Sequence, residues 1–192
     1  MTKIFKSSIE DVLISGGIGI IPTDTIYAIA GSALNKRTVE KIYKLRKRNL
    51  KKPMIILIGS MAQLKIFGVR LDNQSKEIIK KLWPGKFSIV LPCRSKKWAY
   101  IHRGTKSLAF RLPQGKPHNR ILINLLKKTG PLVAPSANFE GDPPAKNINE
   151  AEDYFGDKVD FYLDAGTLRS KPSTLIKIVK GKVFVLRMGS EL

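Results

Sequence analysis

The sequence predicts a mixed α/β (α+β) fold with an open mixed sheet flanked by helices. Short β-branched segments bounded by Gly or Pro are typical of buried strands, and segments with apolar residues at helical spacing separate them. Near the end, two strand patterns are joined only by Lys180 and Gly181, as in a hairpin. Because a hairpin makes part of the sheet antiparallel, a fully parallel sheet is not expected. The sequence has no linker or internal repeat, so we expect one domain over residues 1–192.

Helices are expected where apolar side chains recur every three or four positions. The first is indicated by Ser7 and Glu10, which match a capping box, and by Gly16 and Gly17 as its end. The same pattern predicts further helices from Asn35 to the basic run at 46–52, from Ser60 to Gly68, around Ile78 to Leu82, and from Ile121 to Leu126.

Strands are expected at residues 18–21, 54–58, 88–91, 108–112, 132–134, 161–163, 174–179 and 182–186. Two of these strands end in polar motifs, PTDT at residues 22–25 and PSAN at residues 135–138. In open α/β sheets ligands bind at the carboxyl ends of strands, so the hydroxyl and amide groups of both motifs are candidates to contact a ligand. The alternative is a plain turn, because Thr, Ser, Asn and Asp all favour turns.

The chain is strongly basic, with 35 Lys and Arg against 15 Asp and Glu and a formal net charge of +20. Such a surface attracts polyanions such as RNA or nucleotide phosphates, and the charge alone fits a soluble surface equally well. The densest cluster contains Arg46, Arg48 and Lys52, and it fits either a phosphate clamp or a solvated helix end. Arg111 differs, because a cation within an apolar strand needs an anionic partner or an aqueous cleft.

Several kinds of site are excluded by what the sequence lacks. Cys93 is the only cysteine, so an internal disulfide and a CxxC metal cluster are excluded and a reducing cytoplasm is expected. His102 and His118 have no metal-ligand spacing beside them, so no metal site is predicted. Neither a P-loop, a GxGxxG fingerprint nor a nucleophile elbow occurs. An apolar run of about 18 residues is also missing, so no membrane contact is expected.

Seven fragments in order carry a family resemblance: PTDTIYAIA, KIYKLRKRNLKKPM, WPGKFSIVL, SLAFRLP, PSANFEGDPPA, PSTLIKI and LRMG. From about Gly16 to Gly189 the chain resembles the YrdC/TsaC family, the threonylcarbamoyl-AMP synthases, in its short form. The resemblance implies a YrdC-like twisted mixed sheet with a large basic concavity.

The resemblance also implies a reaction and a set of site residues. The reaction joins L-threonine, bicarbonate or CO2 and ATP, accompanied by Mg²⁺, into threonylcarbamoyl-AMP and pyrophosphate. The product would pass to a downstream tRNA threonylcarbamoyl transferase. By motif, L-threonine would be bound by Thr23, Arg111, Ala134 and Ser173. ATP would be bound by Arg46, Arg48, Lys52, Ser107, Ser136, Asn138 and Arg187, with Arg46 and Arg48 also acting in catalysis.

Several residues depart from the family pattern, among them Arg46, which stands where the family usually has Lys, and Ala28 and Asn49, which replace a common Gly and Pro. Leu57 stands where longer relatives often have a threonine-contacting His, and Pro144 removes an expected nucleotide-binding hydroxyl. Glu140 would repel phosphate if it faced the site.

Two alternatives to this enzyme remain open from the sequence. One is a non-catalytic protein of the same fold that binds double-stranded RNA or tRNA, which the charge of +20 favours. The other is a paralogue that acts on a different carbamoyl-type substrate. RNA-binding sheet faces usually interleave aromatic residues, whereas the aromatic residues here lie mostly in apolar patterns, so we prefer the synthase.

Overall fold

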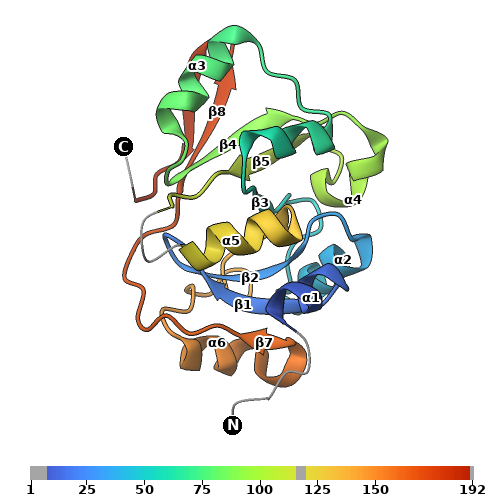
Figure 1. Ribbon diagram of the computed structural model, residues 1–192, viewed down its shortest axis with the longest axis vertical. Coiled ribbons are helices and arrows are strands. Elements are labelled where there is room, and N and C mark those ends of the chain that lie inside the picture. The colour runs from blue at the N-terminus through green and yellow to red at the C-terminus, as the bar shows by residue number, and fades with distance from the viewer. Residues whose placement is uncertain (1–7, 116–119, 191–192) are drawn as a thin grey trace.

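The computed structural model describes residues 8–115 and 120–190, and these residues form one open mixed sheet flanked by helices (Figure 1). The described strands run in the order β7-β1-β2-β6-β3-β5-β4-β8-β9. The pairs β1/β7, β3/β5 and β4/β8 are parallel, and the other neighbours are antiparallel. The predicted fold class is therefore confirmed.

The strand bounds are β1 (Ile18–Pro22), β2 (Tyr27–Ser32), β3 (Ile55–Leu57), β4 (Phe87–Pro92), β5 (Ser107–Arg111), β6 (Leu132–Val133), β7 (Phe161–Tyr162), β8 (Thr174–Val179) and β9 (Lys182–Arg187).

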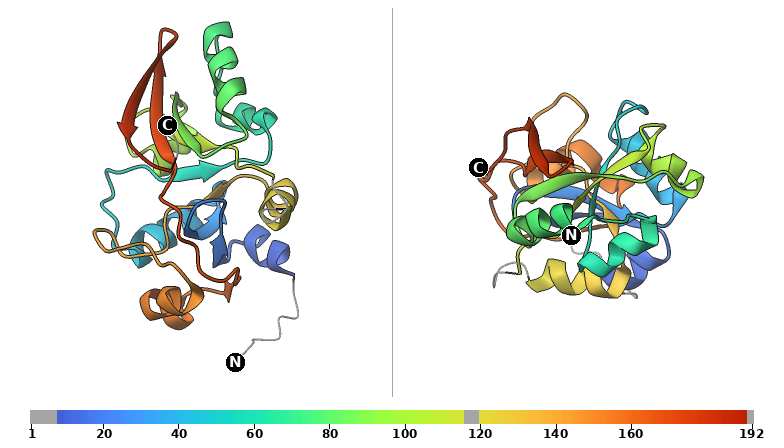
Figure 2. Two further views of the ribbon diagram at one scale, coloured as in Figure 1. Left: turned by 90° about the vertical axis from the view of Figure 1, so that its left-hand side faces the viewer. Right: turned by 90° about the horizontal axis from the view of Figure 1, so that it is seen from above.

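Helices cover both faces of the sheet. In the turned view of Figure 2, α1 and α5 lie on one side of the sheet, and α2 and α6 lie on the other. Figure 1 shows α3 beside β8 and α4 near β5, in the half of the molecule that contains β4. The helix bounds are α1 (Ile9–Ile14), α2 (Lys36–Leu45), α3 (Asn73–Leu82), α4 (Ala99–His102), α5 (Arg120–Thr129) and α6 (Ile148–Phe155).

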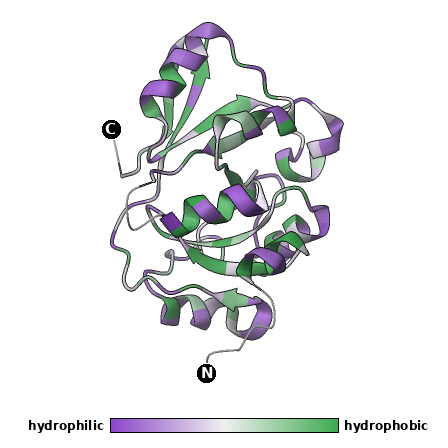
Figure 3. Cartoon of the chain, viewed as in Figure 1, coloured by the Kyte–Doolittle hydropathy of each residue, from purple (hydrophilic) through white to green (hydrophobic). Residues whose placement is uncertain are grey.

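The core lies on both faces of the central strands. Along β1, Ile20 packs in the cluster that contains Ile42 of α2, whereas Ile21 packs in the cluster that contains Leu126 of α5. This alternation follows from the two-residue period of a strand, and burial of both faces keeps the strand ends in fixed positions. Figure 3 shows that α5 carries hydrophobic and hydrophilic stripes, as expected for a helix packed on one side.

The prediction of strands needs one correction, because the sequence pattern predicts no strand at residues 27–32, where the structure has β2. β2 pairs with β1 from Ile18↔Gly31 to Pro22↔Tyr27. Gly31 lets α2 pack closely on this strand, because a Cβ added there would lie 2.4 Å from Cγ2 of Thr38, and Ala28 and Ala30 are buried against the opposite side, in the cluster that contains Leu126 of α5. Close packing in the folded chain therefore outweighs the low strand propensity of Ala and Gly.

The helix predictions need three further corrections. The first helix is capped by Ser8, whose Oγ accepts from Asp11 N at 3.1 Å while the Asp11 carboxylate accepts from Ser8 N. The predicted capping box of Ser7 with Glu10 is therefore wrong, and Ser7 itself lies outside the described residues. The segment Met61–Phe67 is a 3-10 helix that ends at Gly68, and helices α4 and α6 are absent from the prediction.

None of the helices within residues 8–115 and 120–190 combines the length and apolar character that a membrane-spanning helix requires. The single domain, the large basic concavity and the cytoplasmic location stay predictions.

Candidate anion-binding site

A cavity is lined by the turn between β1 and β2, by β3, by the ends of β5 and β6, and by residues next to β8 and in β9. Leu57 of β3 gives it an apolar wall at the position where the sequence departs from the family pattern. The lining includes six of the predicted site residues, namely Thr23, Arg111, Ala134, Ser136, Ser173 and Arg187. The structure therefore brings together all four residues predicted for threonine and two of those predicted for ATP.

Arg111, at the end of β5, is 4% exposed and has the anionic partner that a buried cation requires. Its guanidinium forms an ion pair with the buried carboxylate of Asp24. It also donates from Nη1 to Thr25 Oγ1 at 2.9 Å and from Nε to Gly85 O at 3.3 Å. Arg111 is thus fixed against the PTDT turn, and a ligand carboxylate at this place would share the guanidinium with Asp24.

The PTDT turn is shaped by the hydroxyl of Thr23. Thr23 Oγ1 donates to Ile26 O at 2.7 Å and accepts from the backbone N of Thr25 and of Ile26, both at 3.1 Å. This is the turn-forming role that Thr and Asp favour. Since Thr23 also lines the cavity, the turn places the same residue where it can contact a ligand.

Ser173 is held from two sides. Its Oγ lies 2.8 Å from Oγ of Ser88, which is fully buried in β4, and its carbonyl oxygen accepts from Arg187 Nη2 at 2.8 Å. Sequence reasoning missed Ser88, although a lone hydroxyl inside an apolar strand is a signal for a buried polar contact. Gly189 packs directly behind this point, since a Cβ there would lie 2.4 Å from the carbonyl carbon of Ser173.

Positive charge converges on the cavity. Burial, together with the nearby cations Arg111 and Arg48, lowers the pKa of Arg187 from its usual value. A cation whose charged form is disfavoured by like charges is stabilised by an anion bound between them. Arg111 and Arg187 both line the cavity, so the arrangement favours a ligand that carries negative charge.

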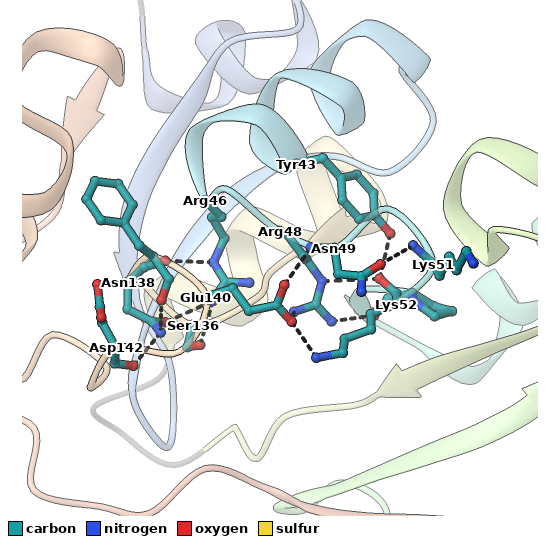
Figure 4. Close-up of polar contacts among 12 residues, drawn as sticks. Tyr43, Arg46, Arg48, Asn49, Lys51, Lys52, Ser136, Asn138, Glu140 and Asp142 are labelled. Carbon is teal, nitrogen blue, oxygen red and sulfur yellow. Dashed lines mark hydrogen bonds and ion pairs between the residues drawn. The ribbon is translucent and has the colours of Figure 1, made fainter.

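Arg46 joins the end of α2 to the PSAN loop (Figure 4). It is 2% exposed, and its guanidinium donates from Nε to Asn138 O at 3.0 Å and from Nη2 to Asn138 Oδ1 at 2.9 Å and Ser136 Oγ at 3.2 Å. Burial lowers the pKa of Arg46 to about 10, so it stays charged at neutral pH. Its buried Nη1 makes no hydrogen bond within the described residues.

The basic run is folded into a loop, residues 48–53, that is closed by its own cation. Arg48 donates from Nε to Lys52 O at 3.2 Å and from Nη2 to Pro53 O at 2.8 Å. Glu140 reaches this loop from the PSAN side, as Figure 4 shows. Its carboxylate accepts from Asn49 N and from Lys52 Nζ at 2.8 Å and lies 3.9 Å from Arg48 Nη1. The hydrogen bond from Asn49 N–H, and to a smaller extent the one from Lys52, lowers the pKa of Glu140 from its usual value.

Two of the residues predicted for ATP are placed differently from expectation. The Asn138 side chain is already used within its loop, because Nδ2 donates to Phe139 O and Asp142 O while Oδ1 accepts from Arg46. Ser107 lies four positions before Arg111, about 13 Å along β5, and its described side-chain contact is with Thr105. Ser107 is thus not among the residues that line the cavity, and neither are Arg46, Arg48, Lys52 and Asn138.

No group of three or more His, Cys, Asp or Glu side chains suited to hold a metal ion occurs in the described part of the chain. His102 is buried and its Nδ1 accepts from Gly104 N at 3.1 Å. His118 lies outside the described residues.

Comparison with known proteins shows that the chain matches one family model and is similar to several relatives and solved structures. The Sua5/YciO/YrdC family model, described as "Telomere recombination", matches residues 11–189. The threonylcarbamoyl-AMP synthase of Pyrococcus abyssi is 30% identical over 177 residues, which is 91% of this chain and 51% of that protein. A putative threonylcarbamoyl-AMP synthase of Methanocaldococcus jannaschii is 32% identical over 92% of this chain and 82% of its own length.

Among solved structures, P. abyssi Sua5 complexed with L-threonine is similar with a TM-score of 0.84 and 28% identity. The match covers 94% of this chain and 52% of that one. The chain thus spans about half the length of the P. abyssi protein.

Proposed function

The chain belongs to the Sua5/YciO/YrdC family, and from this premise we propose that it is a threonylcarbamoyl-AMP synthase. Relatives carrying that name match at about 30% identity over most of the chain, and one similar solved structure is that of P. abyssi Sua5 complexed with L-threonine. The proposed reaction converts L-threonine, bicarbonate or CO2 and ATP into threonylcarbamoyl-AMP and pyrophosphate.

The observation that supports this proposal most strongly is the presence of Arg111 and Arg187 in the lining of one cavity, together with the hydroxyl groups of Thr23, Thr25, Ser136 and Ser173. The chemistry needs such an arrangement, because both threonine and ATP bring negative charge to one place. The neutral amine of threonine attacks CO2 and loses a proton, which gives a carbamate. A carbamate oxygen then attacks the α-phosphorus of ATP, and pyrophosphate leaves. Positioning and charge stabilisation are sufficient for both steps, so no covalent nucleophile is required.

We assign the threonine to the part of the cavity next to the PTDT turn. The guanidinium of Arg111 would bind the threonine carboxylate beside Asp24, and Thr23, Ala134 and Ser173 would surround the rest of the amino acid. The apolar wall at Leu57 suits the methyl group of threonine, because it offers no competing hydrogen-bond partner.

We assign the phosphates of ATP to the cations on the PSAN side. Arg46 would contribute its buried Nη1. Further phosphate oxygens would be bound by Ser136, Lys52 and Arg187. Arg46 and Arg48 would also stabilise the negative charge that develops as pyrophosphate leaves. Mg²⁺ would enter as part of the ATP complex, held by phosphate oxygens and water, since Mg²⁺ commonly binds in this way without a protein cage. Ser107 and Asn138 stay weaker candidates for direct contact.

The proposal is tested by pyrophosphate release in the presence of L-threonine, bicarbonate and the magnesium complex of ATP. We expect release to depend on threonine and to fall at least about tenfold in Arg48→Ala, as for loss of a charge-assisted contact. Arg37→Ala, on the exposed side of α2, is the matched control and should behave as the wild type. Release that does not require threonine would overturn the proposed reaction.

The RNA-binding alternative makes a different prediction. For a synthase, turnover proceeds without RNA, and the product passes to a downstream tRNA threonylcarbamoyl transferase that modifies tRNA adenosine. A strict requirement for tRNA, with affinity for it that falls steeply as salt rises, would favour the alternative.

A further inference from the structure

We propose that Glu140 is an internal counter-ion of the phosphate-binding loop that lowers the affinity for polyphosphate ligands. The proposal rests on the proposed function for the identity of that loop, residues 48–53, as a nucleotide-binding element. It assigns a role to a residue at which the chain departs from the family pattern.

The position of Glu140 is fixed by its backbone as well as by its side chain. Its backbone N donates to Arg46 O at 2.9 Å, which attaches the PSAN loop to the end of α2. From there the carboxylate accepts from Asn49 N and Lys52 Nζ and faces Arg48 Nη1 at 3.9 Å (Figure 4). One carboxylate thus pairs with Lys52 and Arg48, two of the four cations that the proposed function gives to phosphate.

These contacts set Glu140 in competition with a bound phosphate. Lys52 Nζ is 2.8 Å from the carboxylate, so a phosphate oxygen bound to the same ammonium would lie within a few ångströms of it. Either the carboxylate stays and repels the phosphate, or it moves away and loses its contacts. In both cases binding becomes weaker, and more so for a ligand with more negative charge.

The partial burial of the carboxylate strengthens this effect. The Glu140 side chain is 22% exposed and that of Arg48 is 18% exposed, so water screens their interaction less than that of a free surface pair. Lys52 is 61% exposed, which leaves it able to turn from the carboxylate to a ligand. The basic loop is therefore already paired before any ligand arrives.

Substitution of Glu140 by Gln separates charge from shape. The amide oxygen of Gln can still accept from Asn49 N, so the loop keeps this hydrogen bond, while the negative charge is removed. Glu77→Gln is the matched control, because Glu77 forms a comparable Glu–Lys contact with Lys80 at 2.9 Å on the surface of α3.

The test is calorimetric binding of ATP, inorganic tripolyphosphate and AMP to the full chain at low salt, without Mg²⁺. We expect Glu140→Gln to bind ATP and tripolyphosphate about tenfold more tightly than the wild type, with a much smaller change for AMP. The gain should shrink as salt is raised, since the effect is electrostatic. Glu77→Gln should leave all three affinities unchanged. Thermal unfolding of each variant confirms that it is folded.

The outcomes distinguish this proposal from the proposed function. Equal or weaker binding of ATP and tripolyphosphate by Glu140→Gln would overturn the counter-ion role while leaving nucleotide binding in place. If neither the wild type nor the variant binds ATP, the nucleotide site itself fails, and both proposals fail with it.

Discussion

Arg46 and Asn138 are joined by two hydrogen bonds, from Arg46 Nε to Asn138 O at 3.0 Å and from Arg46 Nη2 to Asn138 Oδ1 at 2.9 Å. Both residues are buried, and they lie 92 positions apart in the chain. The contact holds the basic run and the PSAN loop together. If the Arg46 guanidinium and the Asn138 side chain separated, buried polar atoms of both residues would be left without hydrogen bonds.

The first prediction concerns this contact. Arg46→Lys keeps the charge, but a single ammonium cannot reproduce the directed bonds to Ser136 and Asn138, so we expect a loss of about 1–2 kcal/mol in the free energy of unfolding. Urea denaturation measures it. Arg37→Lys, on the exposed side of α2, should leave the midpoint unchanged. Equal stability of Arg46→Lys and the wild type would show that the contact does not hold the loop.

The second prediction concerns Arg111. If its guanidinium binds the threonine carboxylate, Arg111→Lys should raise KM for L-threonine at least about tenfold and change KM for ATP much less, because Lys lacks the planar fork. The same change removes bonds to Thr25 and Gly85, so stability is measured alongside. A folded variant with both KM values unchanged would show that Arg111 has only a structural role, through its contacts with Asp24, Thr25 and Gly85.

The sequence predicts the site better than it predicts the contacts within it. PTDT, PSAN and Arg111 are identifiable because polar groups at strand ends and a cation in an apolar strand are local signals. By contrast, the pairing of Arg111 with Asp24 and of Glu140 with Lys52 depends on which loops become neighbours, and no local pattern records that. Strand β2 is hidden for a similar reason, since its Ala and Gly residues reflect close packing on the two faces of the sheet, Gly31 against α2 and the Ala residues in the cluster of α5, rather than strand propensity.

The third prediction concerns the close approach at Gly189. A Cβ there would lie 2.3 Å from Pro172 O and 2.4 Å from the backbone of Ser173 and Thr174, so Gly189→Ala must shift this backbone. We expect a loss of about 1–3 kcal/mol in the free energy of unfolding, as for other overpacked sites. Gly115→Ala is the control, because among the described residues its Cβ would meet only Ile123 Cγ1, at 3.9 Å. A Gly189→Ala protein as stable as the control would contradict the close packing.

The fourth prediction concerns Tyr43 of α2, which contacts the backbone of the loop at residues 48–53. Its hydroxyl donates to Lys52 O at 2.9 Å, and the guanidinium of Arg103 lies 4.0 Å above its ring. Tyr43→Phe should cost about 1 kcal/mol of stability and, if the loop binds phosphate, raise KM for ATP without raising KM for threonine. Tyr162→Phe also removes a bond to a backbone carbonyl, that of Gly156, and should leave both KM values unchanged. A threonine-specific effect of Tyr43→Phe would argue against our assignment of the loop.

The fifth prediction is a pH dependence that follows from the lowered pKa of Glu140. The hydrogen bond from Asn49 N and the contact with Lys52 lower this pKa in the folded chain, so in the interval between the folded and unfolded values the unfolded chain binds more protons. The stabilisation is therefore fully present above the ordinary pKa of Glu, and it is lost as pH falls through the lowered value.

The variant Glu140→Gln lacks the stabilisation by the Glu140 carboxylate at every pH. Hence the stability difference between wild type and variant should be constant from about pH 7 to 5 and should shrink below about pH 4. Urea denaturation across this range measures it, with Glu152→Gln in α6 as the control for loss of an exposed carboxylate. A difference that persists undiminished at low pH would mean that Glu140 acts through its shape and not its charge, and the counter-ion role would lose its basis.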